Sequence, residues 1–161
     1  MRTMPKSKVV SPEEVSFLCD QLRKEKAVIV FTNGIFDLLH PGHVEYLTAA
    51  RKMGTHLIVG INTDDSTRRI KGDKRPLIPL PFRAEVLAAL SVVSHITWFD
   101  EDTPAEIISK VRPAILVKGG DWKPEQIVGR DFVESYGGKV LSIPFLSGYS
   151  TTAMIEKILK L

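Results

Sequence analysis

The stretch FTNGIFDLLHPGH (residues 31–43) joins an apolar run to a segment with helical spacing. The apolar residues 27–31 predict a buried strand, because short apolar runs bounded by turn residues are typical of parallel sheets. The strand is expected to stop at Asn33-Gly34, and a helical pattern begins after Pro41. In a parallel α/β sheet such a junction lies at the carboxyl edge of the strand, where ligands bind.

Two histidines, His40 and His43, fall within this junction. Free backbone N–H groups and the positive end of the helix dipole make a helix N-terminus a binding site for anions, phosphate above all. The neighbouring glycines allow a ligand to approach the backbone closely. Phosphate binding is therefore the interpretation that we favour. Two alternatives stay open from the residues alone: a metal site, with Asp37 as the nearest third ligand, and a structural role at the helix entry.

The rest of the chain alternates between strand and helix patterns. Strands are expected over residues 27–32, 56–61, 95–99, 114–117 and 139–144, and helices after Ser11-Pro12 and over 42–53, 81–90, from 102, near 130–136 and from 150 to about 160. Residues 66–80 are basic, contain Gly and Pro, and predict a loop. This alternation predicts a single α/β Rossmann-like domain with a five-stranded, parallel, doubly wound sheet and right-handed crossovers.

Length and composition are those of one globular domain. We expect a tail and a helix over residues 1–26 and the domain proper over 27–161. The net charge of +3 is spread along the chain, so it fits a small phosphorylated substrate and does not require a nucleic acid. No segment is apolar for long enough to span a membrane, and the single cysteine, Cys19, fits a reducing compartment as a buried small side chain. We therefore expect a cytoplasmic protein without a membrane partner.

Three short motifs make the chain recognisable. They are GIFD followed by HPGH (residues 34–37 and 40–43), KGGDW (118–122) and GYSTT (148–152). The chain resembles the cytidylyltransferase-like nucleotidyltransferases, whose signature G-x-F-D…H-x-G-H, G-x-D-W-type segment and G-x-S-T-T element occur in this order. The resemblance extends over residues 27–158, so it implies the nucleotidyltransferase fold for nearly the whole chain.

The resemblance implies roles for individual residues. His40 and His43 would contact a nucleoside triphosphate and stabilise charge on its α-phosphate, with Lys71, or in its place Lys74 or Arg75, as a further catalytic cation. The nucleotide-binding residues implied are Asn33, Gly34, Ile35, Phe36, His40, Gly42, His43, Gly148, Ser150, Thr151 and Thr152. The substrate-binding residues implied are Asp37, Lys71, Arg83, Gly120, Asp121 and Trp122. Ser150 to Thr152 are also ordinary helix caps, and a capped N-terminus still offers N–H groups to phosphate.

Within this family the chain looks most like the adenylyltransferase domain of ADP-heptose synthases and its free-standing counterparts. The segments that carry this likeness are TNGIFD (32–37), NTD (62–64), KGD with RP (71–73 and 75–76), EDTP (101–104) and LVKGGD (116–121). Glycerol-phosphate-type members have R-T-E-G-x-S-T-T where this chain has FLSGYSTT (145–152), and loss of that arginine counts against CTP. The resemblance thus implies transfer of AMP from ATP to D-glycero-β-D-manno-heptose 1-phosphate, for lipopolysaccharide core biosynthesis.

The chemistry of nucleotidyl transfer consists mostly of positioning and charge stabilisation, so no protein nucleophile is needed. Mg²⁺ is expected to arrive on the triphosphate without protein ligands, and a separate sugar kinase would supply the acceptor. The alternatives are a cytidylyltransferase acting on a polyol or other sugar phosphate, and a nucleotide-binding module without turnover. If the chain self-associates, we expect a symmetric homodimer, the commonest soluble oligomer.

Overall fold

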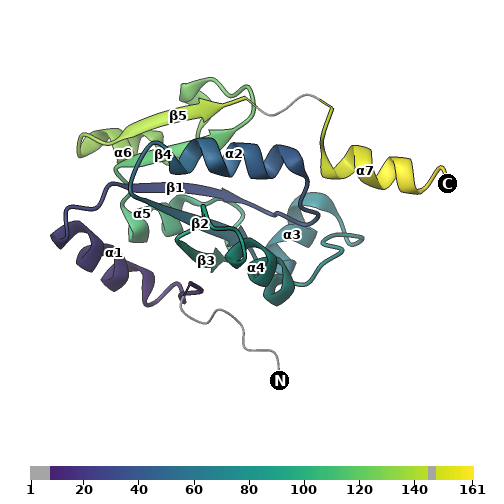
Figure 1. Ribbon diagram of the computed structural model, residues 1–161, viewed down its shortest axis with the longest axis horizontal. Coiled ribbons are helices and arrows are strands. Elements are labelled where there is room, and N and C mark those ends of the chain that lie inside the picture. Colours follow the sequence, from purple (N-terminus) through teal and green to yellow (C-terminus); the bar gives the residue numbers. More distant parts are fainter. Residues whose placement is uncertain (1–7, 145–147) are drawn as a thin grey trace.

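The computed structural model describes residues 8–144 and 148–161 and contains one five-stranded parallel sheet. The strands are β1 (Ile29–Gly34), β2 (His56–Asn62), β3 (His95–Phe99), β4 (Ile115–Gly119) and β5 (Lys139–Ile143). Their spatial order is β3-β2-β1-β4-β5, so the winding reverses between β1 and β4. All carboxyl ends face the side where α3 and α7 lie (Figure 1). A reversal of this kind opens a crevice at the carboxyl edge, here between β1 and β4.

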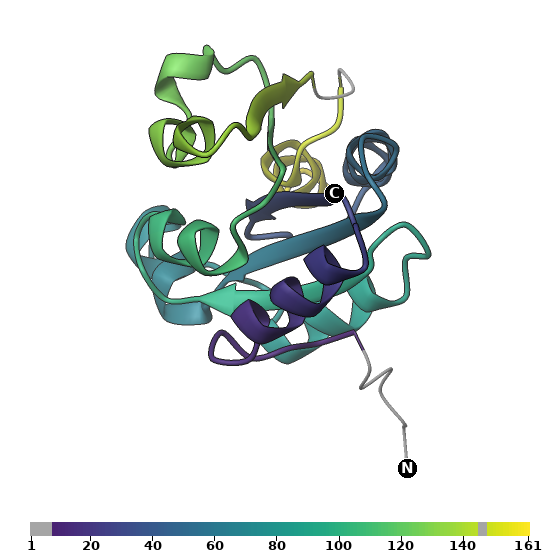
Figure 2. The same ribbon diagram turned by 90° about the vertical axis from the view of Figure 1, so that its left-hand side faces the viewer.

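Helices cover both faces of the sheet (Figure 2). They are α1 (Val15–Lys24), α2 (Pro41–Arg51), α3 (Asp64–Lys71), α4 (Leu80–Ala88), α5 (Ala105–Val111), α6 (Arg130–Ser135) and α7 (Thr151–Ile158), with a 3₁₀ turn, η1 (Pro124–Gln126). One core cluster joins α1, α5 and α6 to the sheet, and a second joins α2 and α4 to its other face. Side chains of β1 alternate between the two clusters, with Phe31 in the first and Val30 in the second. The predicted doubly wound α/β fold is confirmed.

The region 66–80 differs from the sequence-based expectation of a loop, because its first part belongs to α3. Thr63 caps this helix by accepting a hydrogen bond from the Ser66 N–H at 3.1 Å, and two aspartates occupy the first turn. The buried residues of α3 are Ser66 and Thr67. Small polar side chains give no apolar periodicity, so the pattern that reveals other helices is absent here.

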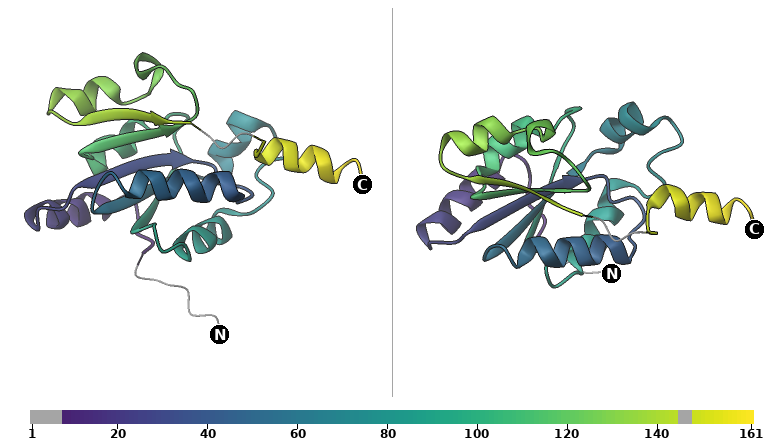
Figure 3. Two further views of the ribbon diagram at one scale, coloured as in Figure 1. Left: turned by 45° about the horizontal axis from the view of Figure 1, so that its top comes forward. Right: turned by 90° about the horizontal axis from the view of Figure 1, so that it is seen from above.

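The α2 and α7 helices are among those that begin at the carboxyl edge of the sheet. The α2 helix has His40 as its N-cap and Pro41 in its first turn, whereas Ser150 caps α7 by accepting from the Ala153 N–H at 3.0 Å. The α7 helix extends away from the rest of the molecule (Figures 1 and 3). None of its residues is buried. The part of α7 that contacts the body is its beginning, where the Thr151 hydroxyl donates to the carbonyl oxygen of Leu38 at 3.4 Å.

Cys19 lies buried in α1, as expected, and burial raises the pKa of its thiol to about 11. Its role is packing in the core beside Val15 and Leu22. Among the helices of the described ranges, none combines the length and the apolar character needed to cross a membrane.

Candidate active site

A cavity of about 330 Å³ lies at the carboxyl edge of β1 and β4, where the sheet topology places the ligand crevice. It is lined by Asn33, Gly34, Ile35, Phe36, Asp37, His43, Lys71, Arg75, Lys118, Gly119, Trp122, Thr151 and Thr152. These residues come from the β1–α2 segment, the end of α3 and the segment after it, the end of β4 with the turn after it, and the first turn of α7. The motifs singled out from the sequence therefore meet around one space.

The backbone of the β1–α2 segment explains two of the motif glycines. A Cβ atom on Gly34 would lie 2.9 Å from Cε2 of Phe36, and one on Gly42 would lie 3.0 Å from the His40 ring. Both approaches are closer than ordinary packing permits. Glycine at these positions lets the Phe36 ring and the His40 ring fold over the chain, and this fixes the shape of the cavity wall.

The two histidines form a stacked pair at the start of α2, with ring centroids 3.8 Å apart. His43 lines the cavity and contacts the Phe36 ring, whereas His40 is buried behind it. Burial, and then the neighbouring His40, lowers the pKa of His43 to about 4, and burial lowers the pKa of His40 as well. Both rings are therefore neutral at pH 7. A neutral imidazole can still donate one N–H hydrogen bond, but it carries no fixed charge.

Neither Nδ1 atom of the pair has a hydrogen-bond partner within residues 8–144 and 148–161. Buried polar atoms without partners are uncommon in native proteins.

Asp37 lines the cavity, but its carboxylate is engaged within the protein. It accepts hydrogen bonds from Arg75 Nε at 2.6 Å and from the backbone N–H groups of Leu77 and Ile78. Burial alone would raise the pKa of Asp37; the two N–H donors and the Arg75 charge outweigh it and lower this pKa. Asp37 therefore anchors the segment after α3 to the β1–α2 segment. Both of its carboxylate oxygens accept hydrogen bonds from protein groups, so neither is free for the predicted contact with substrate.

Arg83 departs from its predicted role. The residue lies in α4, is 1 % exposed and does not line the cavity. Its guanidinium donates to the carbonyl oxygens of Ile35 and Ile78 at 2.6 and 2.8 Å, and to Asp64 Oδ1 at 2.6 Å. A substrate contact does not fit this geometry. Arg83 instead ties α4 to the β1–α2 segment and to the start of α3.

Three cationic side chains line the cavity: Lys71, Arg75 and Lys118. Arg75 is paired with Asp37, whereas Lys74 is absent from the lining. Lys118, at the end of β4, belongs to the KGGDW motif but was not among the predicted site residues, although a lysine at the carboxyl end of a parallel strand is a usable signal. Burial, and then the charge of Lys71, lowers the pKa of Lys118.

The turn after β4 contributes Trp122 to the lining, and its indole N–H donates to the Gly119 carbonyl oxygen at 3.1 Å. Gly120 and Asp121 were predicted to bind substrate with Trp122, but they do not line the cavity, and Asp121 is exposed. At α7, Thr151 and Thr152 line the cavity, whereas Gly148 and Ser150 form the turn that starts the helix. Phe145, where other family members have arginine, lies outside the described residues.

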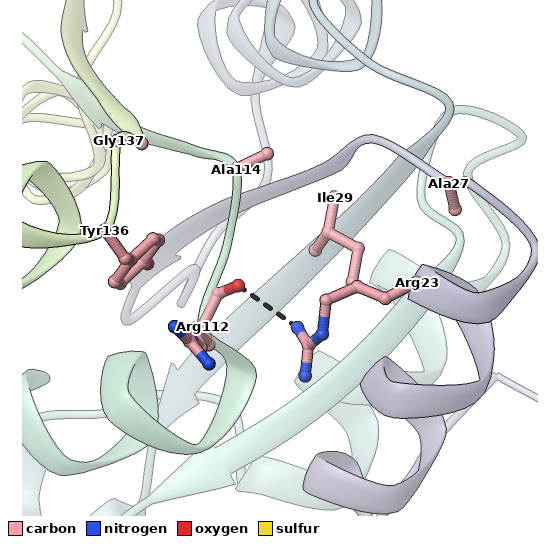
Figure 4. A pocket seen from close by; sticks show the side chains of 8 residues that line it. Arg23, Ala27, Ile29, Arg112, Ala114, Tyr136 and Gly137 are labelled. Atoms are coloured by element: carbon pink, nitrogen blue, oxygen red, sulfur yellow. Dashed lines mark hydrogen bonds between the residues drawn. The ribbon is translucent and has the colours of Figure 1, made fainter.

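A second cavity, of about 400 Å³, lies at the opposite, amino end of the strands (Figure 4). Its cations are Arg23 and Arg112, and its floor includes Ile29. Arg23 donates to the backbone oxygens of Val111 and Arg112 at 2.9 and 3.1 Å, and Arg112 lies over the Tyr136 ring. The Arg23 guanidinium thus closes the end of α5 and the Arg112 guanidinium stacks on Tyr136, so both charges are engaged and this cavity is not the candidate site.

A metal centre was the rival interpretation of the histidines. Within the residues that the structure describes, no group of three or more His, Cys, Asp or Glu side chains could hold a metal ion. The nearest carboxylate, Asp37, already accepts three hydrogen bonds from protein groups.

Comparison with known proteins agrees with this geometry. The cytidylyltransferase-like family model matches residues 31–157. The bifunctional protein HldE of Trichlorobacter lovleyi is 53% identical over 154 residues, which cover 96% of this chain and 31% of HldE. HldE of Geobacter sulfurreducens is 57% identical over 132 residues, covering 82% of this chain and 27% of HldE. The chain thus spans about a third of the length of the curated relatives it matches.

Two solved structures are similar as well. The lipopolysaccharide core biosynthesis protein of Thermoplasma volcanium superposes with a TM-score of 0.63 at 27% identity, covering 75% of this chain and 99% of that one. Pantoate-beta-alanine ligase of Francisella tularensis has a TM-score of 0.62 at 15% identity, covering 96% of this chain and 78% of that one, and shows the fold alone. Motifs, topology and the family match lead to one conclusion: the chain belongs to the cytidylyltransferase-like family and has the fold of a nucleotidyltransferase.

Proposed function

We propose that the protein transfers AMP from ATP to D-glycero-β-D-manno-heptose 1-phosphate and releases pyrophosphate. The observation that carries the transfer chemistry is the cavity at the topological switch point, where His43, the start of α7 and unpaired lysines converge. The similarity to HldE supports the choice of ATP and heptose 1-phosphate.

In this reaction a phosphate oxygen of the sugar phosphate attacks the α-phosphorus of ATP. A new P–O bond forms as the bond between the α-phosphorus and the bridging oxygen breaks, and the electron pair leaves with pyrophosphate. Negative charge spreads over the α-phosphate oxygens and the leaving group, so positioning and hydrogen-bond donors supply the catalysis.

The side chains have matching tasks. The neutral His43 ring donates an N–H to an α-phosphate oxygen, and the free N–H groups at the start of α7, with the Thr151 and Thr152 hydroxyls, receive the β- and γ-phosphates. Lys71 supplies a positive charge from the opposite side of β1. Asp37 and Arg83 hold the loops that carry these groups.

The donor set of the cavity does not fit a protein-held divalent cation, since the carboxylate of Asp37 is fully used. Mg²⁺ would therefore enter as part of the MgATP substrate. The acceptor carries a phosphate on its anomeric carbon, so a sugar kinase acting earlier must provide it.

The test is an assay of purified protein against a matrix of nucleoside triphosphates and sugar phosphates, scored by pyrophosphate release. We expect turnover with ATP and heptose 1-phosphate above every other pair. Pyrophosphate release with CTP and a polyol phosphate, and none with ATP, would replace this assignment by the cytidylyltransferase one. Tight ATP binding without turnover on any acceptor would indicate a nucleotide-binding module.

A further inference from the structure

Within residues 8–144 and 148–161, Lys118 is a cation without a counter-charge. It stands at the carboxyl end of β4 and lines the active-site cavity. No carboxylate pairs with it in the part of the chain that the structure describes, and its nearest ring contact is Trp122, whose centroid lies 5.8 Å from Nζ. Its side chain is half-buried, and partial removal of an ammonium group from water is costly unless an opposite charge compensates it.

A second lysine adds to this cost. Lys71, the last residue of α3, lines the same cavity and is also unpaired in the described ranges. Because burial and the positive charge of Lys71 both lower the pKa of Lys118, the empty cavity disfavours its charged form. An anion held between the two ammonium groups removes the repulsion and stabilises both charges.

The cavity already contains a different place for a triphosphate. His43 and the first residues of α7 come from helices whose N-termini meet at this edge, where Thr151 bonds to Leu38 next to His40. The two lysines come from other elements: Lys71 from α3, which follows β2 on one side of β1, and Lys118 from β4 on the other side. The cavity thus has two cationic or N–H-rich walls, as a reaction between two phosphorylated substrates requires.

We propose that Lys118, together with Lys71, binds the phosphate of the acceptor and presents its oxygen to the α-phosphorus. This assignment rests on the proposed function, since it takes the acceptor to be a phosphate monoester. The lysines remain protonated through the transfer, and the oxygen they hold is the one that forms the new P–O bond. Lys118 is then a substrate-binding residue that neither the histidine motif nor the α7 motif contains.

The test uses Lys118→Met, which keeps the length of the side chain and removes its charge, and Lys118→Arg, which keeps the charge. The matched control is Lys139→Met, at the exposed amino end of β5. We expect Lys118→Met to raise KM for the sugar phosphate at least about 10-fold, the range of a charge-assisted hydrogen bond, with KM for ATP changed less than about 3-fold. Lys118→Arg should recover part of the loss, and the control should match the wild type.

A binding measurement separates this inference from the choice of substrate. Inorganic phosphate, as a stand-in acceptor, is titrated by ³¹P NMR into protein loaded with a non-hydrolysable ATP analogue; Lys118→Met should weaken its binding at least about 10-fold. Equal loss of ATP and phosphate affinity, or unchanged phosphate affinity, overturns the role of Lys118. If wild-type protein binds phosphate through Lys118 but ignores heptose 1-phosphate, the substrate assignment fails and the lysine assignment stands. Thermal unfolding of each variant shows whether a loss of phosphate affinity is caused by misfolding. If Lys118→Met is misfolded, the phosphate affinity of Lys118→Arg, which keeps the charge, decides whether Lys118 binds phosphate.

Discussion

The two ends of the sheet each hold a cavity lined by basic side chains, but the charges are used differently. At the amino end, Arg23 closes the last carbonyl groups of α5 and pairs with Asp20, and Arg112 stacks on Tyr136. At the carboxyl end, Lys71 and Lys118 face the cavity unpaired in the described structure. The larger cavity is the one whose cations are occupied. The candidate site is therefore distinguished by lysines without an ion-pair partner in the described structure, and not by the size of its cavity.

Helix direction explains why this difference arises. The α1, α5 and α6 helices end near the amino-end cavity, so carbonyl groups with partial negative charge point toward it and take up arginine. The α2 and α7 helices begin at the carboxyl edge, where free N–H groups add to the positive charge of the lysines. The parallel topology therefore places helix C-termini, which bind the protein's own arginines, at the amino edge. It places helix N-termini, which favour a bound anion, at the carboxyl edge.

Arg83→Met tests whether a paired cation at the carboxyl edge behaves like those at the amino end. The substitution removes three hydrogen bonds and leaves Asp64 without its partner in a partly buried place. We expect the free energy of unfolding to fall by about 3 kcal/mol, as on breaking a buried ion pair. Denaturant titration measures this loss. Unchanged stability combined with a raised KM would restore a substrate-binding role to Arg83.

His43→Ala tests an unpaired group of the same edge. The ring is proposed to donate an N–H to charge that develops in the transition state, so kcat should fall about 10²-fold or more while stability changes little. Steady-state kinetics and thermal unfolding on the same protein measure both. His56→Ala, at the amino end of β2, serves as the control and should retain kcat. A change confined to KM would contradict the catalytic role.

Arg23→Met tests the amino-end cavity. Loss of the hydrogen bonds to Val111 and Arg112 should lower the free energy of unfolding by about 1.5 kcal/mol, typical of bonds to a charged donor, and leave kcat and both KM values at wild-type levels. If Arg23→Met lowered turnover or substrate affinity, the assignment of a structural role to the amino-end cavity and of catalysis to the carboxyl-end cavity would be wrong.

Much of the fold could be predicted from the sequence because each strand is an apolar run bounded by turn residues. The expected strand over 95–99 coincides with β3, and the boundaries of the other strands differ by at most two residues. The α3 helix could not be predicted in this way, since its buried face consists of Ser66 and Thr67. Its cap at Thr63 and its acidic first turn were the signals that remained.

The site was predictable where its residues belong to local motifs, as His43, Thr151 and Thr152 do. Arg83 and Lys118 show where local reasoning ends. The partners of Arg83 include Ile35, 48 positions away in the chain, so its burial is a tertiary property that no nearby residue reveals. Lys118 belongs to the KGGDW motif, but it follows an apolar run like any solvent-facing lysine at a strand end, and only the tertiary structure shows that it lines the same cavity as Lys71.

The smallest expected effect is the pH dependence of stability that His43 contributes at the carboxyl edge. The pKa of His43 is about 4 in the folded protein against 6.5 for a free side chain. Between these values the unfolded chain binds more protons than the folded one, so stability is complete above pH 6.5 and falls as the pH drops toward 4. At pH 6 the loss due to this residue should stay below about 1 kcal/mol.

The measurement is the free energy of unfolding of wild type and His43→Asn at a series of pH values on both sides of 6.5. Because asparagine does not titrate, the difference between the two proteins should shrink as the pH falls, whereas Arg23→Met should run parallel to the wild type throughout. Parallel curves for His43→Asn as well would mean that the His43 ring is as free to take up a proton in the folded protein as in water. The stacked pair would then enter the reaction as a cation, and the neutral N–H donor proposed for the α-phosphate would have to be replaced by a charged one.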